Sequence, residues 1–161
     1  MKLAELRRAY EPALRRVFHI YWRFKRGMTL GVRALVIDGS GRILLVRHTY
    51  VGGWHLPGGG VETGQTLLGA LRRELMEEAR IELCEEPPLH GVFLNAHVSP
   101  RDHVAIYIVR AFTQDRLPEP NREIAECGFF GLNALPVDTT EGTRRRLAEV
   151  LHGVPRSATW R

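Results

Sequence analysis

Hydrophobic and polar residues follow two different periods along this chain. In one segment, apolar residues occupy every second position: Leu30, Val32, Ala34 and Val36. This period of two predicts a half-buried strand. The stretch Asp38–Gly41 (DGSG) predicts a tight turn, and Arg42–His48 (RILLVRH) predicts the returning strand of a hairpin.

Further strands and two helices are expected after this hairpin. The predicted strands lie at Trp54–Leu56, Ile81–Cys84, Leu89–Asn95, Val104–Phe112 and Gly128–Gly131. One helix is predicted from Thr66 to about Arg80, and a last one, capped by Thr139 or Thr140, reaches Leu151. Strands and helices are mixed without repeated βαβ units, which predicts an α+β fold or a three-layer domain with a mixed sheet.

A helix is also predicted before the first strand, from Pro12 to Arg26, with Gly27 ending it. Its apolar residues share one face: Leu14, Val17, Phe18, Tyr21 and Trp22. Two interpretations stay open. The stripe packs against this domain or a second subunit in a homodimer, or the basic, aromatic residues 12–26 form a helix that lies on a membrane surface.

Composition favours one globular domain. The 161 residues are 44% hydrophobic, no apolar run is long enough to span a bilayer, and no compact apolar leader segment is evident. Cys84 and Cys127 lack zinc-site spacing, so we interpret them as ordinary buried residues of a reduced, cytoplasmic protein. The net charge of +5 suits an anionic partner. A GC-rich coding sequence, which favours arginine codons, explains the excess of arginine equally well.

The most unusual feature is an acidic helix face in this basic chain. Glu74, Glu77 and Glu78 are spaced i, i+3 and i+4, so their side chains project from one side of a helix. A solvated face with an Arg73–Glu77 ion pair is the simpler interpretation. The glycines before the helix, at 58–60, favour a site instead, because their backbone can approach a ligand closely. An all-oxygen donor set without His or Cys suits Mg²⁺ or Mn²⁺, which are commonly shared with substrate phosphates.

The segment Gly59–Ile81 resembles the Nudix box of the Nudix hydrolases. The matching positions are Gly59, Arg73, Glu74, Leu75, Glu77, Glu78 and Ile81. The resemblance extends over about residues 28–150 and implies a Nudix-like α/β/α sandwich with a mixed β-sheet, to which an N-terminal helix is added. Two positions depart from the pattern. Gln65 replaces the first Glu of the box, and Arg80, expected to be left-handed, replaces a Gly.

The resemblance implies hydrolysis of a diphosphate linkage in a nucleoside diphosphate joined to another group X. It implies that Glu77, Glu78, Glu74 and the Gly59 carbonyl bind Mg²⁺ or Mn²⁺. Arg73 is expected to orient these carboxylates, and Glu74 to bind metal or to help activate water. A later acid serves as ligand or base in some family members. Glu123 is the preferred candidate here, Glu126 is the second, and simple ion pairs with nearby arginines are an equal possibility.

Two alternatives to this function remain open. A catalytically weak Nudix-fold module that binds nucleotides would fit the two departures, although the intact glutamates argue against it. Pyrophosphate removal from RNA 5′ ends rests only on positive charge. A small nucleotide-type substrate is the expected partner, RNA is a weaker expectation, and no DNA partner is expected. The expected organisation is a helical extension at 1–27, a Nudix hydrolase domain at 28–153, and a frayed tail at 154–161.

The group X cannot be read from the sequence. Three aromatic residues are candidates for stacking on a base or, equally, for packing: Tyr50, Trp54 and Tyr107. Four basic residues are candidates for phosphate contacts, with solvated charge as the simpler role: Arg42, Arg47, Arg101 and His103.

Overall fold

A computed structural model of the protein describes Phe18, Tyr21 and residues 25–161. The first elements are β1 (Thr29–Val36), β2 (Ile43–His48), β3 (Trp54–His55), α2 (Leu67–Ala79), β4 (Ile81–Leu83) and β5 (Leu89–Leu94). They are followed by β6 (Asp102–Val109), β7 (Phe112–Gln114), β8 (Ile124–Phe130), a 3₁₀ turn (Leu132–Ala134) and α3 (Glu141–His152). The helix predicted over 12–26 falls largely outside the described residues and stays a prediction.

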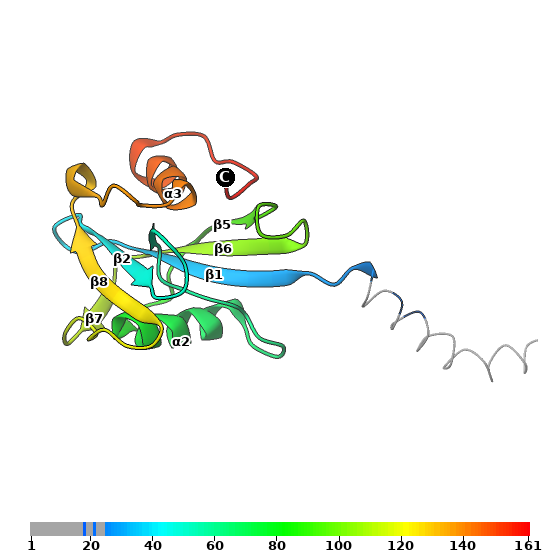
Figure 1. Ribbon diagram of the computed structural model, residues 1–161, viewed down its shortest axis with the longest axis horizontal. Coiled ribbons are helices and arrows are strands. Elements are labelled where there is room, and N and C mark those ends of the chain that lie inside the picture. The colour runs from blue at the N-terminus through cyan, green and yellow to red at the C-terminus, as the bar shows by residue number, and fades with distance from the viewer. Residues whose placement is uncertain (1–17, 19–20, 22–24) are drawn as a thin grey trace, which may run out of the picture.

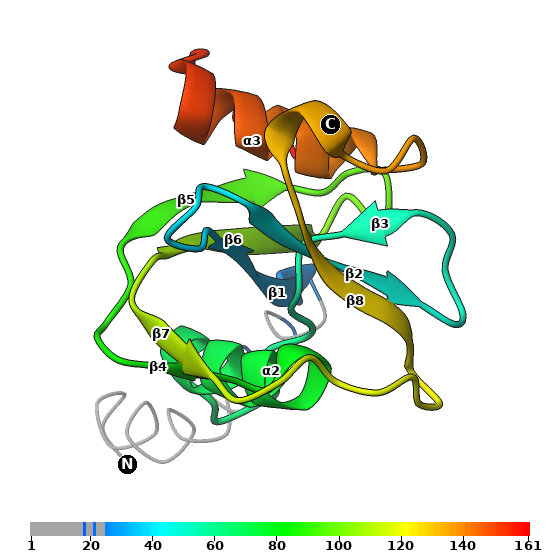
Figure 2. The same cartoon turned by 90° about the vertical axis from the view of Figure 1, so that its left-hand side faces the viewer.

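The helices α2 and α3 cover opposite sides of the strands (Figures 1 and 2). The strands form three small sheets, ordered β1-β6-β5, β3-β2-β8 and β4-β7. Strands β1 and β6 are parallel and in register from Thr29 opposite Asp102 to Val36 opposite Val109, whereas the other pairs are antiparallel. This α+β arrangement with mixed strand directions agrees with the expected fold class. Among the described helices, none has the length and apolar character that crossing a bilayer requires.

Two apolar clusters hold these layers together. One joins α2 to the strands through residues such as Leu71, Leu75 and Val32. The other joins α3 to the opposite side and includes Leu35 and Leu147. Strand β1 contributes to both clusters, so the expectation that it is half-buried is wrong for its second half. Both of its faces are covered there, because a helix packs on each side.

Helix α2 begins and ends as the sequence predicts. The Thr66 hydroxyl accepts a hydrogen bond from the Gly69 amide at 3.0 Å, which caps the first turn. Arg80 ends the helix with φ 55°, and its amide donates to the carbonyl groups of Leu75 and Met76. The predicted left-handed conformation of Arg80 is therefore confirmed, and among the described non-glycine residues only Arg80 has a positive φ.

The predicted hairpin forms only at its tip. The Gly41 amide donates to the Asp38 carbonyl at 2.9 Å, and Ile37 pairs with Ile43 in an isolated bridge. Beyond that bridge the two strands diverge, because β1 pairs with β6 while β2 pairs with β3 and β8. The expectation of a paired hairpin is therefore wrong beyond the turn.

Two other expectations need correction. The strand predicted over Val104–Phe112 is divided, since β6 ends at Val109 and β7 pairs instead with β4. The cysteines are not both buried: the Cys84 thiol is exposed and Cys127 is partly buried.

The chain after Gly153 is not frayed as expected. The Leu94 amide donates to the Ala158 carbonyl at 3.0 Å, and the Trp160 amide donates to the Leu94 carbonyl at 2.9 Å. Thr159 thereby forms a parallel bridge with Leu94, the last residue of β5. The tail is held against the edge of the sheet, near α3 (Figure 1).

Candidate active site

The glycine segment before α2 lies along β1. The Val32 amide donates to the Gly59 carbonyl at 2.9 Å, and the Ala34 amide donates to the Pro57 carbonyl at 2.9 Å. Gly58 has φ 136°, and a Cβ there would lie 2.1 Å from the Val32 carbonyl oxygen. Only glycine fits this position, so the segment is held at a fixed place beside the strand.

Two of the three helix glutamates contact this glycine segment. The Glu78 Oε2 atom accepts a hydrogen bond from the Gly58 amide at 2.7 Å. The Glu74 carboxylate lies so close to Gly59 that a Cβ on that glycine would be 2.4 Å from Glu74 Oε1. Glu74 is 9% exposed and Glu78 is 6% exposed, whereas Glu77 is open to solvent. The acidic face is therefore partly buried and is not a fully solvated surface.

Arg73 bridges the remaining groups. Its guanidinium lies 2.9 Å from Glu74 Oε1 and 3.1 Å from Glu77 Oε2, and it donates to the Gly60 carbonyl at 3.2 Å. The side chain thus connects two carboxylates to the glycine segment. Gln65, the departure from the box pattern, is not bonded to Arg73, and its Oε1 atom accepts instead from the Glu62 amide at 3.1 Å.

Burial makes the negative charge on this face costly. It raises the pKa of Glu78 to about 7 and is also the main cause of a raised pKa at Glu74. The hydrogen bond from Gly58 and the charge of Arg33 only partly offset the effect at Glu78. A bound cation would favour the ionised form of both carboxylates, so their environment fits a metal site.

The donor set fits a hard divalent cation, although the carboxylates are not gathered around one point. Within the described part of the chain, no three His, Cys, Asp or Glu side chains are placed to hold a metal ion together. Each of the three glutamates is engaged by Arg73 or by Gly58. Small side-chain rotations would be needed for the glutamates and the Gly59 carbonyl to share an ion.

Two further polar residues lie beside the glutamates and were not predicted from the sequence: Arg33, which is partly buried, and His48, which is buried. Arg33 donates to the Leu56 carbonyl at 2.6 Å, and burial lowers its pKa while the charges of Glu78 and Glu74 oppose that change. His48 Nε2 lies 3.6 Å from Glu78 Oε1, too far for a hydrogen bond. Burial lowers the His48 pKa to about 4, so the ring is neutral at pH 7.

The two later acids differ in their surroundings. Glu126 lies 3.1 Å from Arg47 in an exposed ion pair, which matches the simpler of its two expected roles. Glu123 is exposed in the turn before β8, and its charge is one of the smaller contributions that raise the Glu78 pKa. No contact joins Glu123 to the glutamates of α2 among the described residues, so its role stays a prediction.

A cavity of about 420 Å³ opens beside the glycine segment. Its lining includes Gly59, Gly60, Arg33, Asn95 and Asp102. Asn95 is 8% exposed, and its Oδ1 atom has no hydrogen-bond partner among the described residues. Two residues of the glycine segment, Gly59 and Gly60, are therefore open to this cavity.

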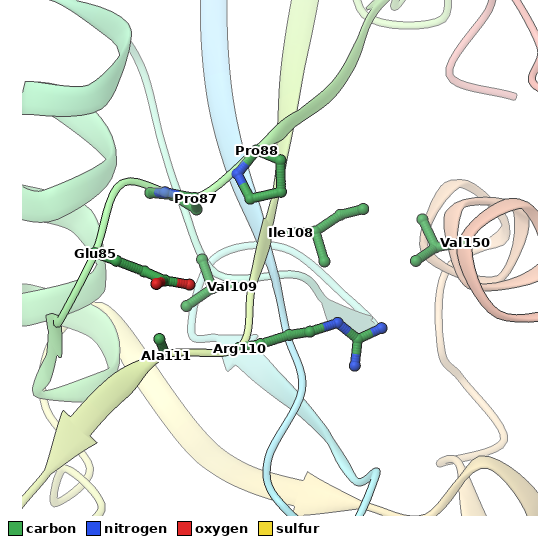
Figure 3. Close-up of a pocket in the computed structure, with 8 residues that line it drawn as sticks. All are labelled: Glu85, Pro87, Pro88, Ile108, Val109, Arg110, Ala111 and Val150. Carbon is green, nitrogen blue, oxygen red and sulfur yellow. The ribbon is translucent and has the colours of Figure 1, made fainter.

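A second cavity, of about 330 Å³, lies between the end of β6 and α3, where Ile108 and Val150 face one another (Figure 3). None of its lining residues belongs to the glycine segment or to α2. It is therefore separate from the candidate active site.

Of the aromatic residues considered for base stacking, Trp54 and Tyr107 are in the core. Tyr50 is 74% exposed and stays available to a ligand. Arg42 is paired with Asp38 at 2.7 Å, which supports its simpler role as a surface charge.

The fold, with a glycine segment held against a helix that carries three glutamates, is that of the Nudix class. The sequence model of the NUDIX domain matches residues 27–151. The chain therefore belongs to the Nudix family.

Two curated relatives share 31% identity with the chain. One is the m7GpppN-mRNA hydrolase NUDT17 of Xenopus laevis, with an alignment of 125 residues that covers 63% of this chain and 41% of that protein. The other is the ADP-ribose pyrophosphatase of Methanocaldococcus jannaschii, matched over 104 residues, 63% of this chain and 61% of that protein. The match thus spans less than two thirds of the length of either relative.

Solved structures agree with the family assignment. A MutT NUDIX hydrolase from Burkholderia pseudomallei is 32% identical, with a TM-score of 0.65 and coverage of 76% of this chain and 97% of that one. An ADP-ribose pyrophosphatase from Streptococcus suis is 28% identical, with a TM-score of 0.61 and coverage of 83% and 96%. The expected Nudix-like fold is confirmed.

Proposed function

We propose that this protein is a divalent-metal-dependent pyrophosphohydrolase that cleaves the diphosphate linkage of a nucleoside diphosphate joined to a group X. The observation that carries the proposal is the buried pair Glu74 and Glu78 on the glycine segment, with Arg73 joining Glu74 to Glu77. Relatives named as an ADP-ribose pyrophosphatase and a UDP-X diphosphatase support this reaction class.

The proposed metal ligands are Glu74, Glu77, Glu78 and the Gly59 carbonyl, and the proposed ion is Mg²⁺ or Mn²⁺. When bound, such an ion offsets the charge of the phosphoryl oxygens and of the leaving group. Arg73 holds Glu74 and Glu77 in position through its two ion pairs. Its guanidinium is engaged by these two carboxylates and by the Gly60 carbonyl, so we assign it a positioning role and no contact with the substrate.

Two groups are proposed to act on the substrate and the attacking water. Arg33 lines the cavity and supplies a partly buried positive charge for a phosphate oxygen. A carboxylate accepts the proton of the attacking water, and we propose Glu74 or Glu123 for this role, with Glu126 as the less favoured candidate because Arg47 occupies it. Replacing each of these acids by Gln and comparing kcat-pH profiles would identify the base, since only its loss removes the acidic limb.

A substrate panel tests the proposal. Nucleoside triphosphates, ADP-ribose, other sugar nucleotides and a capped dinucleotide are each incubated with the protein and Mg²⁺, and then with a chelator. We expect nucleoside monophosphate or phosphate release from at least one compound, and none after chelation. Full activity after exhaustive chelation would contradict the metal requirement, and inactivity on every compound would favour the alternative of a nucleotide-binding module.

The capped dinucleotide tests a second candidate function. A relative named as an mRNA cap hydrolase shares 31% identity with this chain, so cleavage of capped RNA is the second candidate function. Preference for the capped compound over ADP-ribose would favour it.

A further inference from the structure

The last residues of the chain lie at the cavity beside the glycine segment. Trp160 and Arg161 line the same cavity as Gly59 and Gly60, although they lie about 100 residues later in the sequence. Contacts with β5 and with α3 hold them there.

The backbone of the tail is fixed to the end of β5. Leu94 exchanges hydrogen bonds with Ala158 and Trp160, at 3.0 and 2.9 Å, and pairs with Thr159 in a parallel bridge. The Thr159 hydroxyl donates to the Arg161 carbonyl at 2.6 Å. The tail therefore continues the sheet toward the cavity as a short added strand.

A buried ion pair on α3 fixes the path of the tail from the other side. Arg146 is fully buried and lies 2.7 Å from Glu149 Oε1, while it also donates to the Thr159 carbonyl at 3.3 Å. The same Glu149 oxygen accepts from the Ser157 amide at 2.9 Å. A buried ion pair is weak evidence for stability in itself. Here both partners bond to the tail, so their net effect is to position it.

The Trp160 side chain occupies a space that glycine leaves open. A Cβ at Gly142, in the first turn of α3, would lie 2.2 Å from the Trp160 Nε1 atom. The Arg146 guanidinium, from the next turn of α3, lies 5.6 Å from the Trp160 ring centroid and 3.8 Å from that of Phe93. The indole is thus packed between α3 and the sheet while it also faces the cavity.

The charges that line the cavity favour an anionic ligand. The charged side chains among its lining residues are those of Arg33, Arg161 and Asp102, two basic and one acidic. The Asp102 oxygens already accept hydrogen bonds from Thr29 at 2.6 Å and from Asn95 at 2.8 Å. His55 lines the same cavity as Arg33 and Arg161. Burial is the main cause of its lowered pKa, and the charges of the two arginines lower the pKa further.

We infer that residues 157–161 form one wall of the substrate cavity, and that the Arg161 guanidinium determines specificity by binding an anionic oxygen of a nucleoside diphosphate ligand. This inference rests on the proposed function for the class of ligand. It adds a contact that lies outside the glutamate helix and the glycine segment. Trp160 positions Arg161 and closes the cavity beside it.

Ligand binding without turnover tests the inference separately from catalysis. The probe is α,β-methylene-ADP, whose bridging carbon resists hydrolysis, and its Kd is measured by calorimetry in the presence of Mg²⁺. Arg161→Ala is expected to weaken binding roughly 10-fold, the effect of one lost charge-assisted hydrogen bond. Arg161→Lys should retain part of the affinity, and Arg116→Ala, which removes an exposed charge that does not line the cavity, should leave Kd unchanged.

Salt dependence and stability distinguish ligand contact from a structural role. The Kd of the wild-type protein should rise more steeply with salt than that of Arg161→Ala, while their melting temperatures without ligand agree. Equal Kd values for the wild type and Arg161→Ala would overturn the inference, as would no binding of the probe by the wild type. Failure of the proposed function would look different: the probe would bind, but no compound of the panel would be cleaved.

Gly142→Ala is an independent variant, since Gly142 does not line the cavity. The new methyl group must displace the Trp160 ring, so the Kd for the probe is expected to rise by a factor of about 3 or more. In the Trp160→Ala background the same change has nothing to displace, so its effect on Kd should disappear. Equal effects of Gly142→Ala in the two backgrounds would overturn the role assigned to Trp160.

Discussion

At the scale of single residues, the most informative group is the Glu78 carboxyl. It is nearly buried, and it keeps one strong hydrogen bond, from the Gly58 amide at 2.7 Å. Burial raises its pKa to about 7, which means that the folded, metal-free protein carries this charge at a cost in stability at neutral pH. A site that is strained without its ligand is typical of functional positions.

The first prediction follows from that pKa. The folded pKa of Glu78 lies above the ordinary value of 4.5, so its contribution to stability is present below pH 4.5 and is lost as the pH rises through 7. Glu78→Gln removes this loss. In a chelator, the variant should therefore gain stability relative to the wild type between pH 5 and pH 8, measured by thermal unfolding. A stability difference that is the same at both pH values would contradict the assigned burial effect.

Gln65 supports the loop before α2 without carrying charge. Its Oε1 atom accepts from the Glu62 amide at 3.1 Å, and a Glu side chain can accept the same bond. Gln65→Glu restores the family pattern, so kcat is expected to be similar or higher. A clear drop in kcat with unchanged melting temperature would show that the added charge disturbs the neighbouring carboxylates.

Arg80 carries a conformational cost at the end of α2. Its φ of 55° suits glycine, so Arg80→Gly should stabilise the protein by about 1 kcal/mol in urea unfolding. The variant also loses the Arg80–Asp115 ion pair, which is exposed and contributes little. Arg80→Ala is the matched control, because it loses the same pair but keeps Cβ and should gain nothing. Equal stabilities of the two variants would contradict this account.

At the scale of elements, local patterns predicted what depends on local chemistry. The caps of α2 at Thr66 and Arg80 follow from residues next to the helix ends. The pairing of β1 with β6 was not predictable, because the residue pattern of a strand does not indicate which distant strand it will pair with. The docked tail was missed for a related reason. Arg146 and Glu149, spaced i and i+3, resemble an ordinary surface ion pair until the fold buries them.

In the site, too, residues on one helix could be predicted from the sequence, whereas contacts between distant segments could not. Arg73 and the three glutamates could be predicted because one helix carries them at regular spacing. Arg33 could not, because a polar residue in an alternating strand is typical of the solvent-facing side. It becomes part of the site only because the glycine segment and α2 lie next to β1.

The helix predicted over 12–26 supports a prediction about elements. If its apolar stripe packs on this domain or on a second subunit, deleting residues 1–26 should lower the melting temperature or change the oligomeric state measured by light scattering. If the segment lies on membranes instead, deletion should leave the melting temperature and the oligomeric state unchanged and abolish binding to anionic vesicles. We expect the first result, and an unchanged melting temperature together with an unchanged oligomeric state would contradict it.

At the scale of the whole molecule, two layers of packing converge on one site. The apolar cluster between α2 and β1 holds the glutamates against the glycine segment. The layer formed by α3 holds the tail, and with it Trp160 and Arg161, at the other side of the cavity. The division suggests that α2 serves the chemical step and that α3 with the tail serves the choice of ligand.

The central claim is that the glutamates of α2 support metal-dependent hydrolysis. The most direct measurement is kcat as a function of Mg²⁺ concentration, on the panel compound that the wild type cleaves fastest. The wild type should be inactive after chelation. Glu78→Gln should lower kcat by roughly 100-fold or more, which is the size of effect expected when an essential electrostatic contact is lost.

Glu82→Gln is the matched control for that measurement, because Glu82 is an exposed residue of β4 that does not line the active-site cavity. Its kcat should equal that of the wild type at every Mg²⁺ concentration. Near-normal turnover of Glu78→Gln, with the same dependence on Mg²⁺ as the control, would contradict the account.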